Sequence, residues 1–305
     1  MPLPLSRPDR TFKDYLGLAS RGFCMGAADI VPGVSGGTMA FILGIYHELL
    51  DSIKAADAKF LRLLFSLRLR EAAHHLPWRF LLSLAAGIIL AIFSLAHFLE
   101  SQLVQHPTRV WAFFFGLVLA SVVTVSRNVS RWNPATITAA LIALAGAYLL
   151  VGATSAHTPE TVWFLFLSGA LATVAMILPG ISGAYILVLL GKYRFVLAAV
   201  NNRDILTLAV VLAGAALGLA TFARFLSWLF SRYHDLTVAA LTGLMLGSLR
   251  KVWPWKNTAN NTELALPAAL DTEVAITITI GAVGFLAVLL LTWLAARRQQ
   301  PAAAH

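Results

Sequence analysis

The chain has 305 residues, of which 59% are hydrophobic and only 12% carry a charge. So few polar side chains cannot cover a water-soluble globule of this size, and the composition therefore predicts an integral membrane protein. The formal net charge of +9 does not indicate a nucleic-acid partner, because basic residues in such a chain orient loops toward the cytoplasm and contact anionic lipid headgroups. The single cysteine, Cys24, excludes an internal disulfide and a cysteine-based metal site.

The chain begins with an amphipathic segment, residues 1–21, which we expect to lie at the membrane surface without being a removable signal peptide. Two apolar segments, residues 22–50 and 161–199, are interrupted by glycine and proline. A polar, basic stretch at residues 51–79 is predicted to be a loop, with room for a surface helix. Continuous membrane-spanning helices are predicted at residues 80–100, 109–126, 135–155, 206–230, 236–250 and 274–296.

The two interrupted segments are copies of each other. Residues 30–46 and 177–193 are identical at eight of seventeen positions. The stretch "FFGLVLAS" in the first half likewise resembles "LTGLMLGS" in the second. The chain is therefore predicted to be an internal duplication within one membrane domain, with residues 22–155 as the first repeat and 161–296 as the second.

The length of the interrupted segments suggests a topology. Each arm beside a break has about 14 residues, or about 21 Å of helix, which is too short for a hydrocarbon core of about 30 Å. Such arms fit a re-entrant hairpin. Three crossings per half then invert the second half relative to the first, and the excess of basic residues on one side indicates that both termini are cytoplasmic. The predicted fold class is an all-α polytopic membrane protein with two inverted repeats, each a re-entrant helical hairpin plus about three transmembrane helices.

The breaks suggest a binding site. Proline lacks an N–H and glycine adopts unusual dihedrals, so the helix unwinds and exposes backbone groups that survive at membrane depth only inside protein or beside a wet cavity. The restarting helix offers free N–H groups to an anion such as phosphate. The alternative is that glycine and proline only permit tight packing and a kink. The predicted substrate-binding residues here are Pro32, Gly33, Ser35, Gly36, Gly37 and Thr38 in the first break, and Pro179, Gly180, Ser182 and Gly183 in the second.

Charged residues near membrane depth are costly unless paired or functional. Arg21 and Arg224 are predicted to bind the anion, although each can instead extend its charged end to the interface. Asp29 is expected to bind with them or to carry a coupling proton. Glu48 is a second coupling candidate, with an interfacial charge as its alternative. Lys192, after the second hairpin, either gathers anionic headgroups or is an ordinary loop charge.

The motifs "GAADIVPGVSGGTMAFILGIY" and "LPGISGAYILVLLGKY" resemble those of the bacterial polyprenyl-phosphate translocases, formerly a membrane family of unknown function. The resemblance covers nearly the whole chain. It implies a flippase that returns undecaprenyl phosphate from the outer to the inner leaflet of the bacterial cytoplasmic membrane, with the hairpins as substrate site and membrane lipids as surroundings. The residues alone indicate only a transporter of an anionic group, with coupling to protons or ions.

Two other functions remain open at this point. A membrane-embedded polyprenyl-diphosphate phosphatase also needs an anion seat, but the sequence has no compact constellation of nucleophile, base or metal ligands. A small-anion transporter or channel would also use re-entrant loops. We therefore predict no enzyme, no catalytic residues, no metal and no cofactor, and the sequence allows a homo-oligomer.

Overall fold

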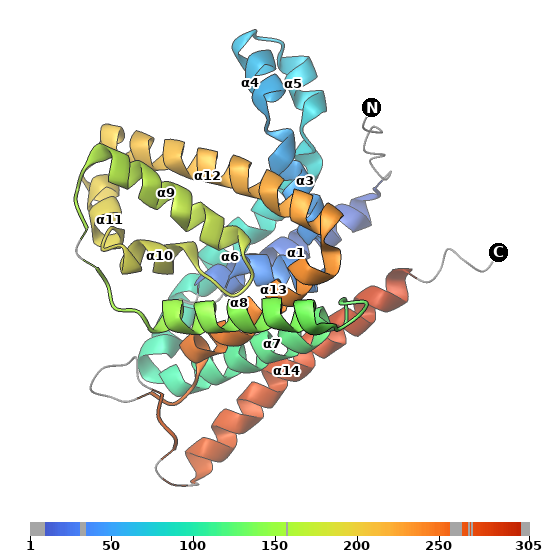
Figure 1. Ribbon diagram of the computed structural model, residues 1–305, viewed down its shortest axis with the longest axis vertical. Helices are drawn as coiled ribbons and strands as arrows, with labels where there is room; N and C mark the ends of the chain where they lie inside the picture. The colour runs from blue at the N-terminus through green and yellow to red at the C-terminus, as the bar shows by residue number, and fades with distance from the viewer. Residues whose placement is uncertain are drawn as a thin grey trace, which may run out of the picture.

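The structure is a computed structural model, which describes residues 10–30, 35–156, 158–256, 264–267, 269 and 271–299. These residues form helices connected by turns and loops (Figure 1). The helices are α1 (Phe12–Ile30), α2 (Gly36–Ile42), α3 (Tyr46–Ala55), α4 (Ala58–Phe65), α5 (Leu69–His75), α6 (Trp78–Gln105), α7 (Pro107–Ser126), α8 (Pro134–Gly152), α9 (Val162–Ile177), α10 (Gly183–Leu189), α11 (Tyr193–Asn201), α12 (Ile205–Arg232), α13 (His234–Val252) and α14 (Thr272–Gln299).

The all-helical class and the six continuous helices predicted from the sequence are confirmed, with small shifts at their ends. Among the described residues, five helices are long and apolar enough to cross a membrane, namely α6, α7, α8, α12 and α14. The bent pair of α10 and α11 would provide a sixth if it were one span. The helix α13 is less apolar and lies inside the bundle, where it packs against α7 and α8. The protein is therefore a multi-pass helical membrane protein.

The start of the chain differs from the expectation. The predicted surface segment and the first arm of the hairpin form one helix, because α1 runs without interruption from Phe12 to Ile30. Its residues Gly22 and Gly26, which lie beyond the predicted boundary at residue 21, pack directly on the backbone of α6.

The helix pairs follow the same order in both halves of the chain. In the first half α1 packs along α6, and in the second α9 packs along α12. The remaining long helices pair between the halves, α7 with α14 and α8 with α13. Figure 1 shows α7, in blue-green, beside α14, in red, although a large part of the chain separates them.

Glycines make these pairs close. A Cβ atom on Gly116 of α7 would overlap the carbonyl oxygen of Gly281 on α14, and one on Gly243 of α13 would overlap that of Ala140 on α8. Gly116 and Gly243 occupy matching positions of "FFGLVLAS" and "LTGLMLGS". Membrane helices without a hydrophobic drive to associate depend on such small residues for backbone contact, so the duplicated glycines set the duplicated helix partners.

The two arms of each hairpin differ more in length than predicted. The incoming helices α1 and α9 have 19 and 16 residues, whereas the return helices α2 and α10 have seven each. Each return helix ends at a turn in which a glycine, Gly44 or Gly191, has a φ near +70°, which favours a residue without a Cβ. After the second turn the chain bends by 106° between α10 and α11.

The predicted basic loop contains helices. After α3, the short helices α4 and α5 project from one end of the bundle (Figure 1). Their base is held by His75, whose Nε2 lies 3.1 Å from Oδ1 of Asp57.

Candidate functional site

In the first hairpin, two side-chain oxygens accept hydrogen bonds from the free N–H groups at the start of the return helix. Oδ1 of Asp29 accepts a hydrogen bond of 2.6 Å from the amide of Gly36, and the hydroxyl of Ser35 accepts one of 3.1 Å from the amide of Gly37. Pro32 and Gly33 lie outside the described residues. The anion site (the seat) that the sequence predicts at the N-terminus of the return helix is thus occupied by a carboxylate of the chain itself.

The close fit of Asp29 depends on the glycine that follows Ser35. A Cβ atom at Gly36 would overlap Oδ2 of Asp29, so a larger residue would push the carboxylate away. Asp29 also keeps exposed surface at the end of α1. The carboxylate can therefore exchange protons or be displaced while it remains bonded to the return helix.

The second hairpin has a different start. Its turn runs through Pro179 and Gly180, whose φ is +92°. Ser182 is in the extended N-cap conformation of α10, as Ser35 is for α2, but its side chain makes no capping hydrogen bond. Gly183 packs against the carbonyl oxygen of Ala172, which a Cβ would approach to 2.5 Å. The second seat therefore has neither the hydroxyl cap nor the acidic partner of the first.

The two hairpins meet at their tips. The amide of Gly180 donates a hydrogen bond of 2.9 Å to Oγ1 of Thr38. The hydroxyl of Ser35 donates to the carbonyl of Met176 at 3.4 Å, and the hydroxyl of Tyr46 donates to the carbonyl of Ile177 at 2.9 Å. The Ser35, Thr38 and Tyr46 side chains are buried. Gly37 completes the contact, since a Cβ there would approach the Ile177 carbonyl oxygen to 2.9 Å. Motif residues far apart in the sequence thus form one polar cluster inside the bundle.

The charged candidates lie around this cluster in different ways. Arg21 is half-buried on α1, about two turns before Asp29. Arg224 is exposed on α12, and its guanidinium donates to the carbonyl of Ala220 in the same helix at 3.4 Å. Of the two, Arg21 shares a helix with a residue of the hairpin tip.

Glu48 has a partner that the sequence did not indicate. Its two carboxylate oxygens accept hydrogen bonds of 2.6 and 2.7 Å from Arg10. The Arg10 guanidinium also lies 5.7 Å from the ring centroid of Phe80. This bidentate pair raises the pKa of Arg10, chiefly through the hydrogen bonds to Glu48, and ties the segment before α1 to α3.

Lys192 is buried, with only 2% of its surface exposed, so neither an exposed headgroup collector nor an ordinary loop charge describes it. Its Nζ donates a hydrogen bond of 2.8 Å to the carbonyl of Thr158 and lies 5.8 Å from the centroid of the Phe164 ring. Thr158 in turn donates to the carbonyl of Leu190. Lys192 therefore fastens the loop before α9 to the end of the second return helix.

Two other residues of the site were missed at the sequence level. Tyr46 lies in the repeated motif, and its burial was hidden because tyrosine is equally common at membrane interfaces. Tyr185 replaces Thr38 in the second copy, and its hydroxyl donates to the carbonyl of Val151 at 2.9 Å. Both tyrosines brace a return helix, and the repeat alignment was the signal that singled out their positions.

A cavity of about 320 Å³ lies beside the turn at Gly44, where the first return helix ends. Its wall includes Tyr46, His47, Asn128 and His234. Within the described parts of the chain, no group of three or more His, Cys, Asp or Glu side chains is arranged to hold a metal ion.

Comparison with known proteins identifies the family. The family model described as undecaprenyl phosphate translocase-like matches residues 25–267. A polyprenyl-phosphate transporter of Vibrio cholerae is 44% identical over 80% of this chain and 80% of its own length. A polyprenyl-phosphate transporter of Staphylococcus aureus is 28% identical over 77% of this chain and 84% of its own length. These relatives are transporters rather than enzymes, as the sequence predicted. No solved structure matches the chain. The matched region includes Asp29, both return helices and the contact between their tips, and the chain belongs to the undecaprenyl phosphate translocase-like family.

Proposed function

We propose that this protein moves undecaprenyl phosphate from the outer to the inner leaflet of the bacterial cytoplasmic membrane. In this proposal both termini are cytoplasmic, the hairpins are re-entrant and the two halves are inverted relative to each other. The observation that carries the proposal is the polar cluster at the hairpin tips, where Gly180 donates to Thr38 inside the bundle. Irregular backbone at membrane depth is typical of transporter sites built between repeats.

The phosphate would bind where the chain already binds a carboxylate. Asp29 accepts from the amide of Gly36 at 2.6 Å, so this N–H is aimed at an anionic oxygen. A phosphate that displaces Asp29 gains the same charge-assisted hydrogen bond and can reach the hydroxyls of Ser35 and Thr38. On the opposite hairpin, the hydroxyl of Ser182 is free of a capping role. Arg21 is the arginine that we assign to the phosphate, because it lies on the same helix as Asp29.

Protonation of Asp29 would couple transport to the proton gradient. A neutral carboxyl group binds the Gly36 amide more weakly than a carboxylate and leaves the seat to the phosphate. Inward movement of an anion opposes an inside-negative potential by about 2.3 kcal/mol per charge per 100 mV. A proton carried with the phosphate cancels one such charge. Asp29 would therefore both release the Gly36 amide to the phosphate and couple the movement to the proton gradient.

Release toward the cytoplasm would follow the cavity beside the turn at Gly44. His47 and His234 line it, and Tyr46 links it to the tip of the second hairpin. The polyprenyl tail would stay in lipid while one repeat rocks against the other.

The first test is binding of undecaprenyl phosphate to the purified protein, with undecaprenol as the uncharged control. We expect phosphate-dependent binding that falls in Ser35→Ala and Arg21→Ala, with a smaller effect of Arg224→Ala. Flipping would then be measured in proteoliposomes with and without a pH gradient. Equal binding of undecaprenol, or indifference to all three substitutions, would remove the hairpins as the headgroup site.

A further inference from the structure

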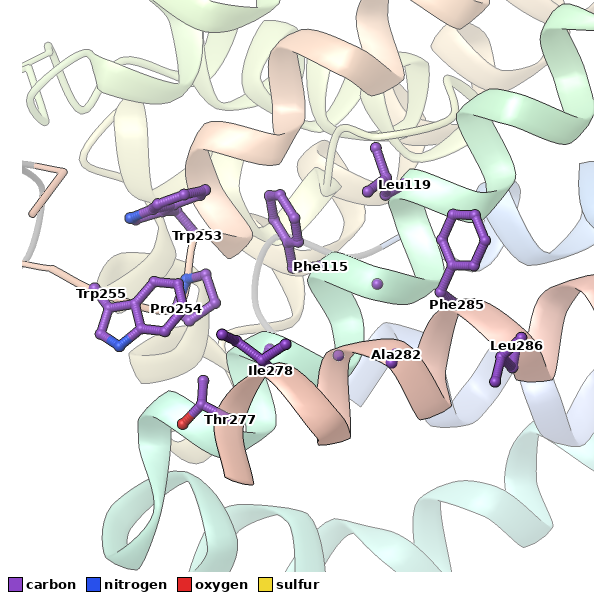
Figure 2. A pocket seen from close by; sticks show the side chains of 13 residues that line it. Phe115, Leu119, Trp253, Pro254, Trp255, Thr277, Ile278, Ala282, Phe285 and Leu286 are labelled. Carbon is purple, nitrogen blue, oxygen red and sulfur yellow. The ribbon is translucent and has the colours of Figure 1, made fainter. Parts of the chain in front are cut away.

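An apolar groove of about 450 Å³ runs between α7 and α14 (Figure 2). Phe115 of α7 and Ile278, Ala282 and Phe285 of α14 line it, and Trp253 and Trp255 close one end. The helices approach so closely that a side chain on Gly116 would overlap the carbonyl oxygen of Gly281. The groove is therefore a depression over a rigid floor.

The aromatic end of the groove is held in place. The ring of Trp253 meets the edge of Phe115 at a centroid distance of 5.3 Å and lies 5.6 Å from Trp255. Its Nε1 donates to the carbonyl of Ala265 at 2.9 Å. The wall is thus formed before any ligand arrives, which lowers the entropy that binding would cost.

Two lysines lie at this same end. Lys256 directly follows Trp255, and its Nζ lies 4.1 Å from the ring centroid of Trp111 on α7. The Nζ of Lys251 lies 4.5 Å from the ring centroid of Tyr185 on α10. In the part of the chain that the structure describes, neither lysine forms an ion pair. Two neighbouring cations favour an anion between them.

The lysines also connect the groove to the second hairpin. Lys251 is one turn beyond Ser248 on α13, and Ser248 contacts the hairpin tip, because a Cβ at Gly180 would lie 2.8 Å from its hydroxyl. The aromatic partner of Lys251, Tyr185, belongs to the return helix of that hairpin. A continuous series of residues therefore leads from the groove, past two cations, to Gly180.

We propose that the groove binds the head-proximal isoprene units of a polyprenyl phosphate, with its phosphate at Lys256 and Lys251 before transfer to the second hairpin. This inference rests on the proposed function and adds a first docking position to it. A single groove suits one chain, and paired cations suit an anionic end group rather than a zwitterionic one. A volume of about 450 Å³ matches a small-molecule pocket rather than a whole polyprenyl chain, so the rest of the tail stays in lipid.

The test compares two alanines that are both exposed on long apolar helices, Ala282 in the groove and Ala145 on α8. Binding of undecaprenyl phosphate, undecaprenol and dioleoyl phosphatidylglycerol would be measured on the purified full chain by native mass spectrometry. We expect Ala282→Phe to weaken undecaprenyl phosphate binding about tenfold and Ala145→Phe to leave it unchanged. Lys256→Gln should weaken the binding of undecaprenyl phosphate but not that of undecaprenol, and Lys256→Arg should restore the binding of undecaprenyl phosphate. Thermal unfolding of each variant checks the fold, and Lys256→Gln tests the site without filling the groove.

The other outcomes separate the two proposals. Wild-type protein that does not bind undecaprenyl phosphate would overturn the proposed function and this inference together. Wild-type binding that depends on Ser35 but not on Ala282 or Lys256 would leave the function intact and remove the groove. An equal loss of phosphatidylglycerol binding in Ala282→Phe would show a groove for ordinary lipid and also overturn the inference.

Discussion

The amide of Gly180 donates a 2.9 Å hydrogen bond to Oγ1 of Thr38, and this buried bond joins two hairpins that are 142 residues apart in the chain. The φ of +92° at Gly180 favours a residue without a Cβ at this position. Because Thr38 has no exposed surface, water cannot replace it as the acceptor.

Thr38→Val should therefore destabilise the protein by about 1–3 kcal/mol, the cost of leaving a buried N–H without an acceptor. Thr38→Ser keeps the hydroxyl and should lose less stability. Thermal unfolding in detergent measures the difference. A Val variant as stable as the Ser variant would show that the bond adds nothing to the junction of the hairpins.

Asp29→Asn should retain the contact with the Gly36 amide, because the Asn side-chain oxygen can accept the same hydrogen bond. It cannot take up a proton, so we expect transport to lose its dependence on the pH gradient. Flipping in proteoliposomes at several pH values measures this. If uptake and its pH profile are unchanged in the variant, Asp29 is not the coupling residue.

Glu48→Gln should reduce stability by about 0.5–1 kcal/mol, as expected for a partly exposed ion pair, because it breaks the bidentate contact with Arg10. We expect transport to continue. A double-mutant cycle with Arg10→Gln isolates the pair. Loss of transport without a change in unfolding temperature would instead make Glu48 a coupling residue.

Gly116→Ala should destabilise the protein by about 1–3 kcal/mol, since its Cβ has no room against the Gly281 carbonyl of α14. Gly146→Ala on α8 is the matched control, because nothing lies within 4 Å of its added Cβ. That control should gain up to about 1 kcal/mol from helix propensity. Equal unfolding temperatures for the two variants would contradict the close packing of α7 on α14.

Binding of undecaprenyl phosphate should weaken as the pH rises through about 8. Burial, together with the charge of Lys251, lowers the pKa of Lys256 to about 8, so this lysine loses its positive charge above that pH. Lys256→Arg keeps its charge throughout and should show a flatter profile between pH 7 and 9. Identical profiles would mean that Lys256 does not contact the phosphate.

Much of the polar cluster at the hairpin tips was visible in the sequence. The repeated Pro-Gly-x-Ser-Gly motif marks both breaks, and Ser35 is the N-cap of the helix that restarts after the first break, as the motif suggests. The occupant of the first seat was not predictable, because whether Asp29 faces solvent or the Gly36 amide depends on how the chain turns between α1 and α2. Arg10 as the partner of Glu48 was equally hidden by a separation of 38 residues.

The sequence by itself determined the membrane class, the positions of the long helices, the two breaks and the similarity between the two interrupted segments. These features depend on the length of apolar runs, on glycine and proline, and on the comparison of one segment with another, all of which are properties of contiguous residues. Only the tertiary structure decided that α7 pairs with α14, that Lys192 is buried and that Thr38 meets Gly180. Those contacts depend on how closely two distant backbones can approach, and that distance is set jointly by glycines and carbonyl groups from both segments.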